Sequence, residues 1–387
     1  MNVTPFAAGR ALWPRSSRRA VACLVSSLCL TLTALALAPA LASAGPPRGF
    51  VGLQSWTDPS GSRFDTLKDS KVSTFRAQLS WTSVEPNKPT GGSCHVGDGC
   101  VHEYRWGRYD RMFEMAGKRG IRILPVLLGS PRWAASKAQN PPMQASQRKA
   151  FYAFTEAAVD RYGPNGSFWP TKNLSGATVG ANDWQVWNEV NLPNYWNGRP
   201  NAAEYSNMVV GTNAAIKRGD GSARTVLAGM PWSGSNATPP EFWKAMFKAN
   251  PRIHKSFYAA AIHPYARTSD LAINEGIRPA VRALDSLVPG DYRRYMWITE
   301  MGWASGKADG RFQVSEYTQG RNLELFYRDL AKIRTSNRIL GAVWFNLVDL
   351  PGADWWAERT GLIRSNKTYK PAWYRLKCVT GASGCRR

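Results

Sequence analysis

Short apolar runs alternate with amphipathic stretches along the chain after residue 45, and this alternation most constrains the possible folds. Eight runs have the length and the content of β-branched and aromatic residues that strands favour. They are 50–54, 74–81, 121–129, 183–191, 224–230, 258–265, 293–303 and 339–350. The runs at 121–129 and 339–350 are apolar almost throughout, which is typical of parallel strands covered by helices.

The stretches between the runs have helical periodicity. In two of them the large apolar residues fall on one helix face: Phe151, Phe154, Ala158 and Tyr162 in 146–163, and Leu323, Phe326, Tyr327, Leu330 and Ile333 in 315–334. Eight strand–helix alternations in one α/β chain predict a (β/α)8 TIM barrel. A doubly wound open sheet is the alternative, but it needs a glycine-rich phosphate turn after the first strand, which 52–56 does not supply. Pro125 fits less well, because it removes a hydrogen-bond donor within a predicted strand.

The first 44 residues have the order of a secretory signal. Arginines at 10, 15, 18 and 19 precede an apolar stretch over 20–38, and Ala42-Ser43-Ala44 provides a small-residue cleavage site. An uncleaved signal anchor is the alternative, since the apolar stretch is just long enough to span a bilayer. We therefore predict a signal peptide at 1–44 and a single barrel domain at 45–387. The protein would be secreted, either free outside the cell or associated with the cell envelope.

The chain is strongly basic, with a formal net charge of +23. The basic residues are scattered and form no nucleic-acid motif, so we predict no nucleic-acid partner. Attraction to an anionic envelope or to an acidic polysaccharide fits an exported protein better, and simple solubility is a further explanation. Beyond the signal no stretch is apolar enough to cross a membrane, so we expect no stable membrane insertion after the signal is cleaved. We also expect a monomeric protein.

Four cysteines remain after removal of the signal. Cys94 and Cys100 are close in sequence, and so are Cys378 and Cys385. Two local disulfides are the simplest of the three possible pairings in an oxidising compartment. A zinc site is the alternative, but the spacings are not those of zinc ligands. We predict two disulfides and no metal.

Two glutamates occupy the ends of strongly apolar runs. Glu189 lies in Asp183-Trp-Gln-Val-Trp-Asn-Glu-Val-Asn191, and Glu300 lies in Tyr295-Met-Trp-Ile-Thr-Glu-Met-Gly-Trp303. A buried carboxylate is costly to desolvate, so it usually has partners or a function there. In a TIM barrel the carboxyl ends of strands four and seven face the same cleft. Two carboxyl groups about 5–5.5 Å apart are what retaining cleavage of a glycosidic bond requires.

The sequences around these glutamates resemble the signatures of clan A of the glycoside hydrolases, over nearly the whole mature chain. Within the clan, the segment from Trp187 to Trp196 is most similar to family 39, with family 5 as the near alternative. The resemblance implies that Glu189 is the general acid/base, that Asn188 binds the sugar 2-hydroxyl, and that Glu300 is the nucleophile. It also implies a carbohydrate substrate, such as xylosides or glycans that contain uronic acids.

Other positions match the clan pattern. Arg76 resembles the arginine near the nucleophile, and His263-Pro-Tyr265 resembles the His-x-Tyr whose tyrosine contacts the nucleophile. Trp344 resembles the tryptophan that forms the floor of the first sugar subsite. Core packing or structural ion pairing is the alternative for each of these residues.

Further tryptophans fall at or just beyond the predicted strand ends, where they could stack on sugar rings. These are Trp56, Trp81, Trp133, Trp232, Trp303 and Trp355. Tryptophan is also a common core residue, so part of this set could only pack. Glu85 also ends a strand, and we expect a structural ion pair there.

These features predict a secreted retaining glycoside hydrolase that needs neither a cofactor nor a metal. The alternative is a non-catalytic carbohydrate-binding or cell-wall-associated protein on the same barrel. Transglycosylation would use the same residues, with a sugar in place of water in the second step.

Overall fold

Eight parallel strands close into a barrel in the computed structural model, which describes residues 46–91, 100–232, 237–306, 312–352 and 355–387. The strand order around the barrel is β1-β10-β7-β6-β5-β4-β3-β2, and every neighbouring pair is parallel. The barrel strands are β1 Val51–Gln54, β2 Thr74–Ser80, β3 Arg122–Leu128, β4 Asp183–Val186, β5 Arg224–Pro231, β6 Ala259–His263, β7 Tyr295–Met301 and β10 Ile339–Phe345. This arrangement confirms the predicted (β/α)8 TIM barrel.

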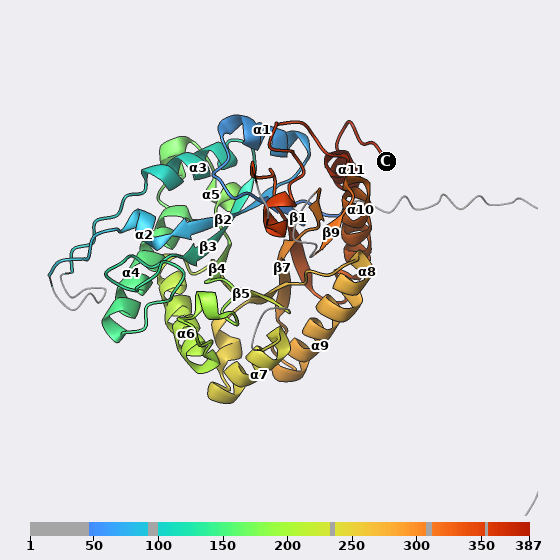
Figure 1. The fold of residues 1–387 in the computed structure, drawn as a ribbon. Coiled ribbons are helices and arrows are strands. Elements are labelled where there is room, and N and C mark those ends of the chain that lie inside the picture. The colour runs from blue at the N-terminus through green and yellow to red at the C-terminus, as the bar shows by residue number, and fades with distance from the viewer. Residues whose placement is uncertain (1–45, 92–99, 233–236, 307–311, 353–354) are drawn as a thin grey trace, which may run out of the picture. The chain divides into compact units, whose positions relative to one another are not determined.

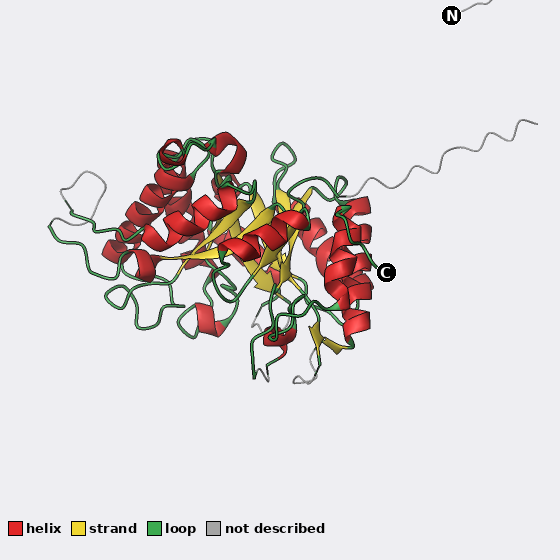
Figure 2. Cartoon of the chain, turned by 90° about the horizontal axis from the view of Figure 1, so that it is seen from above, coloured by secondary structure: helices red, strands yellow, loops and turns green. Residues whose placement is uncertain are grey.

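Helices surround the strands, as Figure 1 shows. The α-helices are α1 Gly61–Asp69, α2 Trp81–Val84, α3 Gly107–Gly117, α4 Ala145–Tyr162, α5 Gly176–Val179, α6 Ala202–Gly219, α7 Pro239–Ala249, α8 Ser269–Leu271, α9 Arg278–Leu287, α10 Glu316–Ile333 and α11 Pro371–Thr380. The 3-10 helices are η1 Pro170–Lys172, η2 Pro193–Tyr195, η3 Ile253–Ser256 and η5 Trp356–Arg359, and η4 Ala272–Ile277 is a π-helix. A separate small sheet pairs β8 Ala304–Ser305 with β9 Gln313–Val314, apart from the barrel in Figure 2.

The apolar patterns explain why these elements form and how they pack. Most residues of the predicted helix faces are fully buried, including Phe151, Phe154 and Tyr162 of α4 and Leu323 and Phe326 of α10, while Ile333 is partly buried. Strand β3 continues through Pro125, which pairs with Ala77 of β2, so one missing donor does not end the strand.

The disulfide predictions have different outcomes. Cys378 and Cys385 are bonded, which closes the end of α11. Cys94 lies outside the described residues; Cys100 is disulfide-bonded, and its pairing with Cys94 stays a prediction. The predicted signal, residues 1–44, also lies outside the described residues. None of the helices in the described part of the chain has the length and apolarity needed to cross a membrane.

Candidate active site

A cavity of about 550 Å³ opens at the carboxyl ends of the barrel strands. Residues at or just beyond the ends of all eight strands contribute to its lining: Gln54, Ser80, Leu128, Glu189, Pro231, Tyr265, Glu300 and Phe345. Arg76 lines it from within β2. In a TIM barrel this end carries the reactive side chains, because loops from all strands meet there. The predicted pair of glutamates therefore lies in one cavity.

Glu189 is placed by a sharp turn and not by a strand. The prediction extended this strand to Asn191, but β4 ends at Val186. Trp187 and Glu189 both have positive φ, at 66° and 44°, so the chain cannot continue as a regular strand. The turn is held because the backbone N–H of Glu189 donates to the carbonyl of Gly229 at 2.9 Å. It presents the carboxyl group to the cavity.

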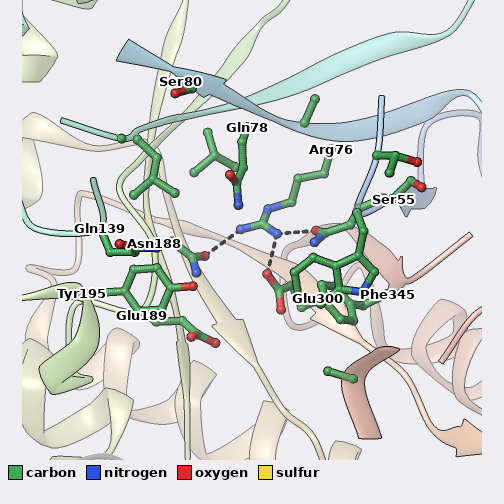
Figure 3. A pocket seen from close by; sticks show the side chains of 18 of the residues that line it. Ser55, Arg76, Gln78, Ser80, Gln139, Asn188, Glu189, Tyr195, Glu300 and Phe345 are labelled. Atoms are coloured by element: carbon green, nitrogen blue, oxygen red, sulfur yellow. Dashed lines mark hydrogen bonds and ion pairs between the residues drawn. The ribbon is translucent and has the colours of Figure 1, made fainter. Parts of the chain in front are cut away.

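Glu300 lies within the last two residues of β7, and its carboxylate is held by donors from other strands. Arg76 Nη1 lies 2.6 Å from Oε1 of Glu300, and the Tyr265 hydroxyl donates to Oε2 at 3.0 Å. Arg76 also donates from Nη2 to Asn188 Oδ1 at 2.7 Å and from Nε to Gln185 Oε1 at 3.0 Å. Figure 3 shows the guanidinium between Asn188 and Glu300.

His263 lies between the two carboxyl groups and is fully buried. Its Nδ1 lies 2.9 Å from Glu189 Oε1 and 3.6 Å from Glu300 Oε2. On the other side of the ring, Nε2 lies 3.1 Å from Thr299 Oγ1. The ring fits because residue 229 is glycine: a Cβ there would lie 2.1 Å from His263 Nε2.

The surroundings separate the pKa values of the two carboxyl groups. Burial raises the pKa of Glu189, and the charge of Glu300 raises it further, although His263 opposes both effects. Burial alone would also raise the pKa of Glu300. The His263 and Arg76 side chains, together with the hydrogen bond from Tyr265, instead bring its pKa below the usual value. One carboxyl group is thus set to keep a proton and the other to stay ionised, which is what acid catalysis beside a nucleophile requires.

The two glutamates and His263 also have side chains that can bind a cation. Glu189, His263 and Glu300 can each direct one ligand atom so that the three atoms lie within 4.8 Å of one another. However, the positively charged guanidinium of Arg76 already pairs with Glu300. This guanidinium neutralises the carboxylate and would repel a metal ion. The arrangement favours proton transfer and nucleophilic attack.

Five predicted aromatic residues do not reach the cavity. Trp81, Trp133, Trp232, Trp303 and Trp344 all lie outside its lining. Trp344 is fully buried and donates from its indole to the carbonyl of Thr360, so it cannot form the floor of a sugar subsite. Trp303 is also fully buried, and its indole N–H donates a hydrogen bond to the carbonyl of Arg267. Trp133 packs on Trp81 outside the cavity lining. Successive side chains on a strand face opposite sides, so the residue after Trp344, Phe345, lines the cavity instead.

The structure confirms the predicted partner-bound state of Glu85 and adds site residues that the sequence did not predict. Glu85 is fully buried and lies 2.5 Å from His102 Nδ1, in the structural pair that was predicted. The missed residues include Gln54 and Gln185, which both accept from Arg76, and Tyr195, which lines the cavity. A glutamine within an apolar strand was the available signal, because a buried amide must find hydrogen-bond partners.

Solved structures provide the comparison with known proteins. No family model matches the chain, and no curated protein matches its sequence. A family 39 glycoside hydrolase from Bacteroides cellulosilyticus WH2 has a similar fold, with a TM-score of 0.64 and 18% identity over 87% of this chain and 64% of that one. A monomeric β-xylosidase from Caulobacter crescentus CB15 has a TM-score of 0.60 and 17% identity, over 86% of this chain and 68% of that one.

An exo-β-1,4-mannosidase from Opitutaceae bacterium strain TAV5 is a third example, with a TM-score of 0.55 and 15% identity over 88% of this chain and 62% of that one. The chain thus spans less than two thirds of the length of the mannosidase and of the family 39 structure from Bacteroides. At these identities the likeness shows the fold. The chain has the same TIM-barrel fold as these solved glycoside hydrolases, and the predicted resemblance to family 39 is confirmed at the level of the fold.

Proposed function

We propose that this chain is a retaining glycoside hydrolase, with Glu300 as the nucleophile and Glu189 as the general acid/base. The observation that carries the proposal is the closeness of the two carboxyl groups, with ligand oxygens within 4.8 Å of each other. Retaining enzymes place their carboxyl groups about 5–5.5 Å apart, whereas inverting enzymes need about 6.5–9.5 Å to admit a water molecule. The opposite pKa shifts of the two groups support the same assignment.

In the first step, an oxygen of ionised Glu300 forms a bond to the anomeric carbon. The bond from that carbon to the glycosidic oxygen breaks, and the leaving oxygen takes the proton of Glu189. The product is a glycosyl ester of Glu300. Arg76 and Tyr265 hold the attacking carboxylate in place through contacts of 2.6 and 3.0 Å. Asn188, fixed by Arg76, is in position to bind a hydroxyl of the attacked sugar.

In the second step, Glu189 is ionised and accepts a proton from water, whose oxygen attacks the anomeric carbon. The ester bond to Glu300 breaks, and the sugar leaves with its original anomeric configuration. His263, 2.9 Å from Glu189, positions that carboxyl group through both steps. With a sugar hydroxyl in place of water, the same step would give transglycosylation.

Replacing Glu300 by glutamine tests the proposal. Glu300→Gln keeps the shape of the side chain but removes the nucleophile, so hydrolysis should fall by about 10⁴-fold or more while the melting temperature stays close to that of the wild type. Glu275→Gln is the matched control, because Glu275 is exposed and lies outside the cavity lining. Substantial hydrolysis by a folded Glu300→Gln protein would refute the assignment.

We further propose that the substrate is a carbohydrate outside the cell. The order of residues 1–44 supports export, and the disulfide between Cys378 and Cys385 fits an oxidising compartment. The amino-terminal sequence of protein recovered from the culture medium should begin at Gly45. Recovery of the intact chain from membranes would instead favour a retained signal anchor.

A further inference from the structure

Two large aromatic side chains remain exposed where the cavity opens. Trp56 is 41% exposed and Trp355 is 50% exposed, although both line the cavity. Their ring centroids lie 5.9 Å apart, and Trp56 also contacts Phe345 at 5.2 Å. We call Trp56, Phe345, Trp355 and Trp356 the aromatic wall. Exposed tryptophans that share one concave surface are typical of a binding site rather than of a core.

The aromatic wall begins at the nucleophile. Trp356 contacts Trp355 at 6.0 Å and the ring of Tyr265 at 4.8 Å, and Tyr265 donates to Glu300. Figure 3 shows Glu300 beside Phe345, whereas Glu189 lies beside Tyr195 on the other side of the cavity. The wall is therefore continuous with Glu300 and lies away from Glu189.

The direction in which the aromatic wall extends determines which sugars of a bound chain it can contact. The nucleophile attacks the face of the anomeric carbon opposite the leaving oxygen, and the leaving sugar departs next to the general acid. A surface that extends from Glu300 away from Glu189 therefore contacts the attacked sugar and the units linked beyond it. The flat apolar face of a sugar ring packs on an indole ring, while its hydroxyl groups need polar partners.

Polar partners lie beside the wall. Asp58, two residues after Trp56, pairs with Arg108, whose Nη2 lies 3.0 Å from Asp58 Oδ1. Both residues line the cavity, and their side chains are 41% and 52% exposed. A carboxylate and a guanidinium at this position offer an acceptor and several donors to sugar hydroxyl groups.

We propose that the aromatic wall binds at least one further sugar on the non-reducing side of the cleaved bond, so that the enzyme cleaves within an oligosaccharide or polysaccharide chain. This inference rests on the proposed glycosidase function and adds the substrate class and the mode of action. An enzyme that only removes single terminal sugars would have no ligand for this surface.

The test compares short and long substrates. The short substrates are 4-nitrophenyl β-glycosides of xylose, glucose and mannose, and the long ones are the β-1,4-linked hexasaccharides of the same sugars with a label at the reducing end. The variant is Trp56→Ala/Trp355→Ala. For the sugar that the wild type cleaves, we compare kcat/KM for the hexasaccharide with kcat/KM for the nitrophenyl glycoside. The ratio of the first to the second should fall by about tenfold or more in the variant, because removing the two indoles costs binding energy only with ligands that reach them. Tyr317→Ala is the matched control, since Tyr317 is 61% exposed outside the cavity lining.

The products provide a second measurement. The wild type should release fragments of two or more sugars from the non-reducing end of the hexasaccharide as its first products. An unchanged ratio in the double variant, or release of single sugars only, would overturn the inference and leave the proposed function standing. Absence of hydrolysis of every short and long probe would count against the proposed function itself, and against this inference with it.

Discussion

Nδ1 of His263 lies 2.9 Å from Oε1 of Glu189, a contact that joins the end of β6 to the turn after β4. The resemblance to clan A places this histidine in the His-x-Tyr motif, two residues before Tyr265. In the structure it lies between both carboxyl groups, and Thr299 and the space at Gly229 fix the ring from behind. The position of the proposed general acid thus depends on Gly229, a residue outside the cavity lining.

Gly229→Ala should therefore impair catalysis. A Cβ at residue 229 would lie 2.1 Å from His263 Nε2 and 2.2 Å from Thr299 Oγ1, so the ring must move and release Glu189. We expect kcat/KM to fall by about tenfold or more and stability to fall by about 1–3 kcal/mol, the usual cost of overpacking a core. Steady-state kinetics and thermal unfolding measure both.

Gly221→Ala is the control, since a Cβ at that position would meet no atom within 4 Å. It should leave kinetics and stability nearly unchanged. Equal behaviour of the two alanine variants would contradict the proposed role of the space at Gly229.

Arg76→Gln should shift the acidic limb of the pH–rate profile to higher pH. Arg76 helps to lower the pKa of Glu300, so its removal raises that pKa, and the ionised nucleophile is then lost at a higher pH as the solution is acidified. At neutral pH we expect kcat/KM to fall by roughly 10²-fold, as when a positioned donor is removed from an active site. Arg119→Gln, which breaks an exposed pair with Asp65, should leave the limb in place. If the acidic limb of Arg76→Gln does not shift, Arg76 does not lower the pKa of Glu300.

Glu189→Gln should affect substrates according to their leaving groups. The raised pKa of Glu189 extends the pH range over which this carboxyl group keeps its proton, and activity should decline as the pH rises through that pKa. Without the acid, cleavage of sugar leaving groups should fall by about 10²–10⁴-fold, and the basic limb should disappear. Formation of the glycosyl ester from a dinitrophenyl glycoside needs no proton and should be much less affected. Equal loss with both leaving groups would argue against Glu189 as the general acid.

The fold and the centre of the site could be predicted because their signals are local in the sequence. Apolar runs and helical faces define the barrel, and Glu300 lies near the end of such a run. The length of β4 could not be predicted, because the positive φ values of Trp187 and Glu189 depend on contacts with β3 and β5. The prediction that Trp344 forms the floor of a sugar subsite was wrong for a related reason. Neighbouring strand residues face opposite sides, and apolarity alone does not show whether Trp344 or Phe345 points inward.

Removal of the disulfide between Cys378 and Cys385 should lower stability without changing catalysis. The bond closes a short loop at the end of α11, on residues that do not line the cavity. A loop of this length contributes roughly 2 kcal/mol in the chain-entropy description. Chemical unfolding of Cys378→Ser/Cys385→Ser should show this loss with kcat unchanged. A large loss of kcat in the folded variant would show that the carboxyl-terminal helix influences the site.

The most direct test of the two-glutamate mechanism is to trap the glycosyl ester. A 2-deoxy-2-fluoro glycoside with a dinitrophenyl leaving group forms the ester readily but releases it slowly, because fluorine destabilises the positive charge that develops in both steps while the leaving group offsets this only in the first. With the sugar that the enzyme cleaves, peptide mass spectrometry should find the added sugar mass on the peptide that contains Glu300, and Glu300→Gln should take up no label. Label on another residue, or cleavage by the wild type with no covalent adduct, would contradict the account.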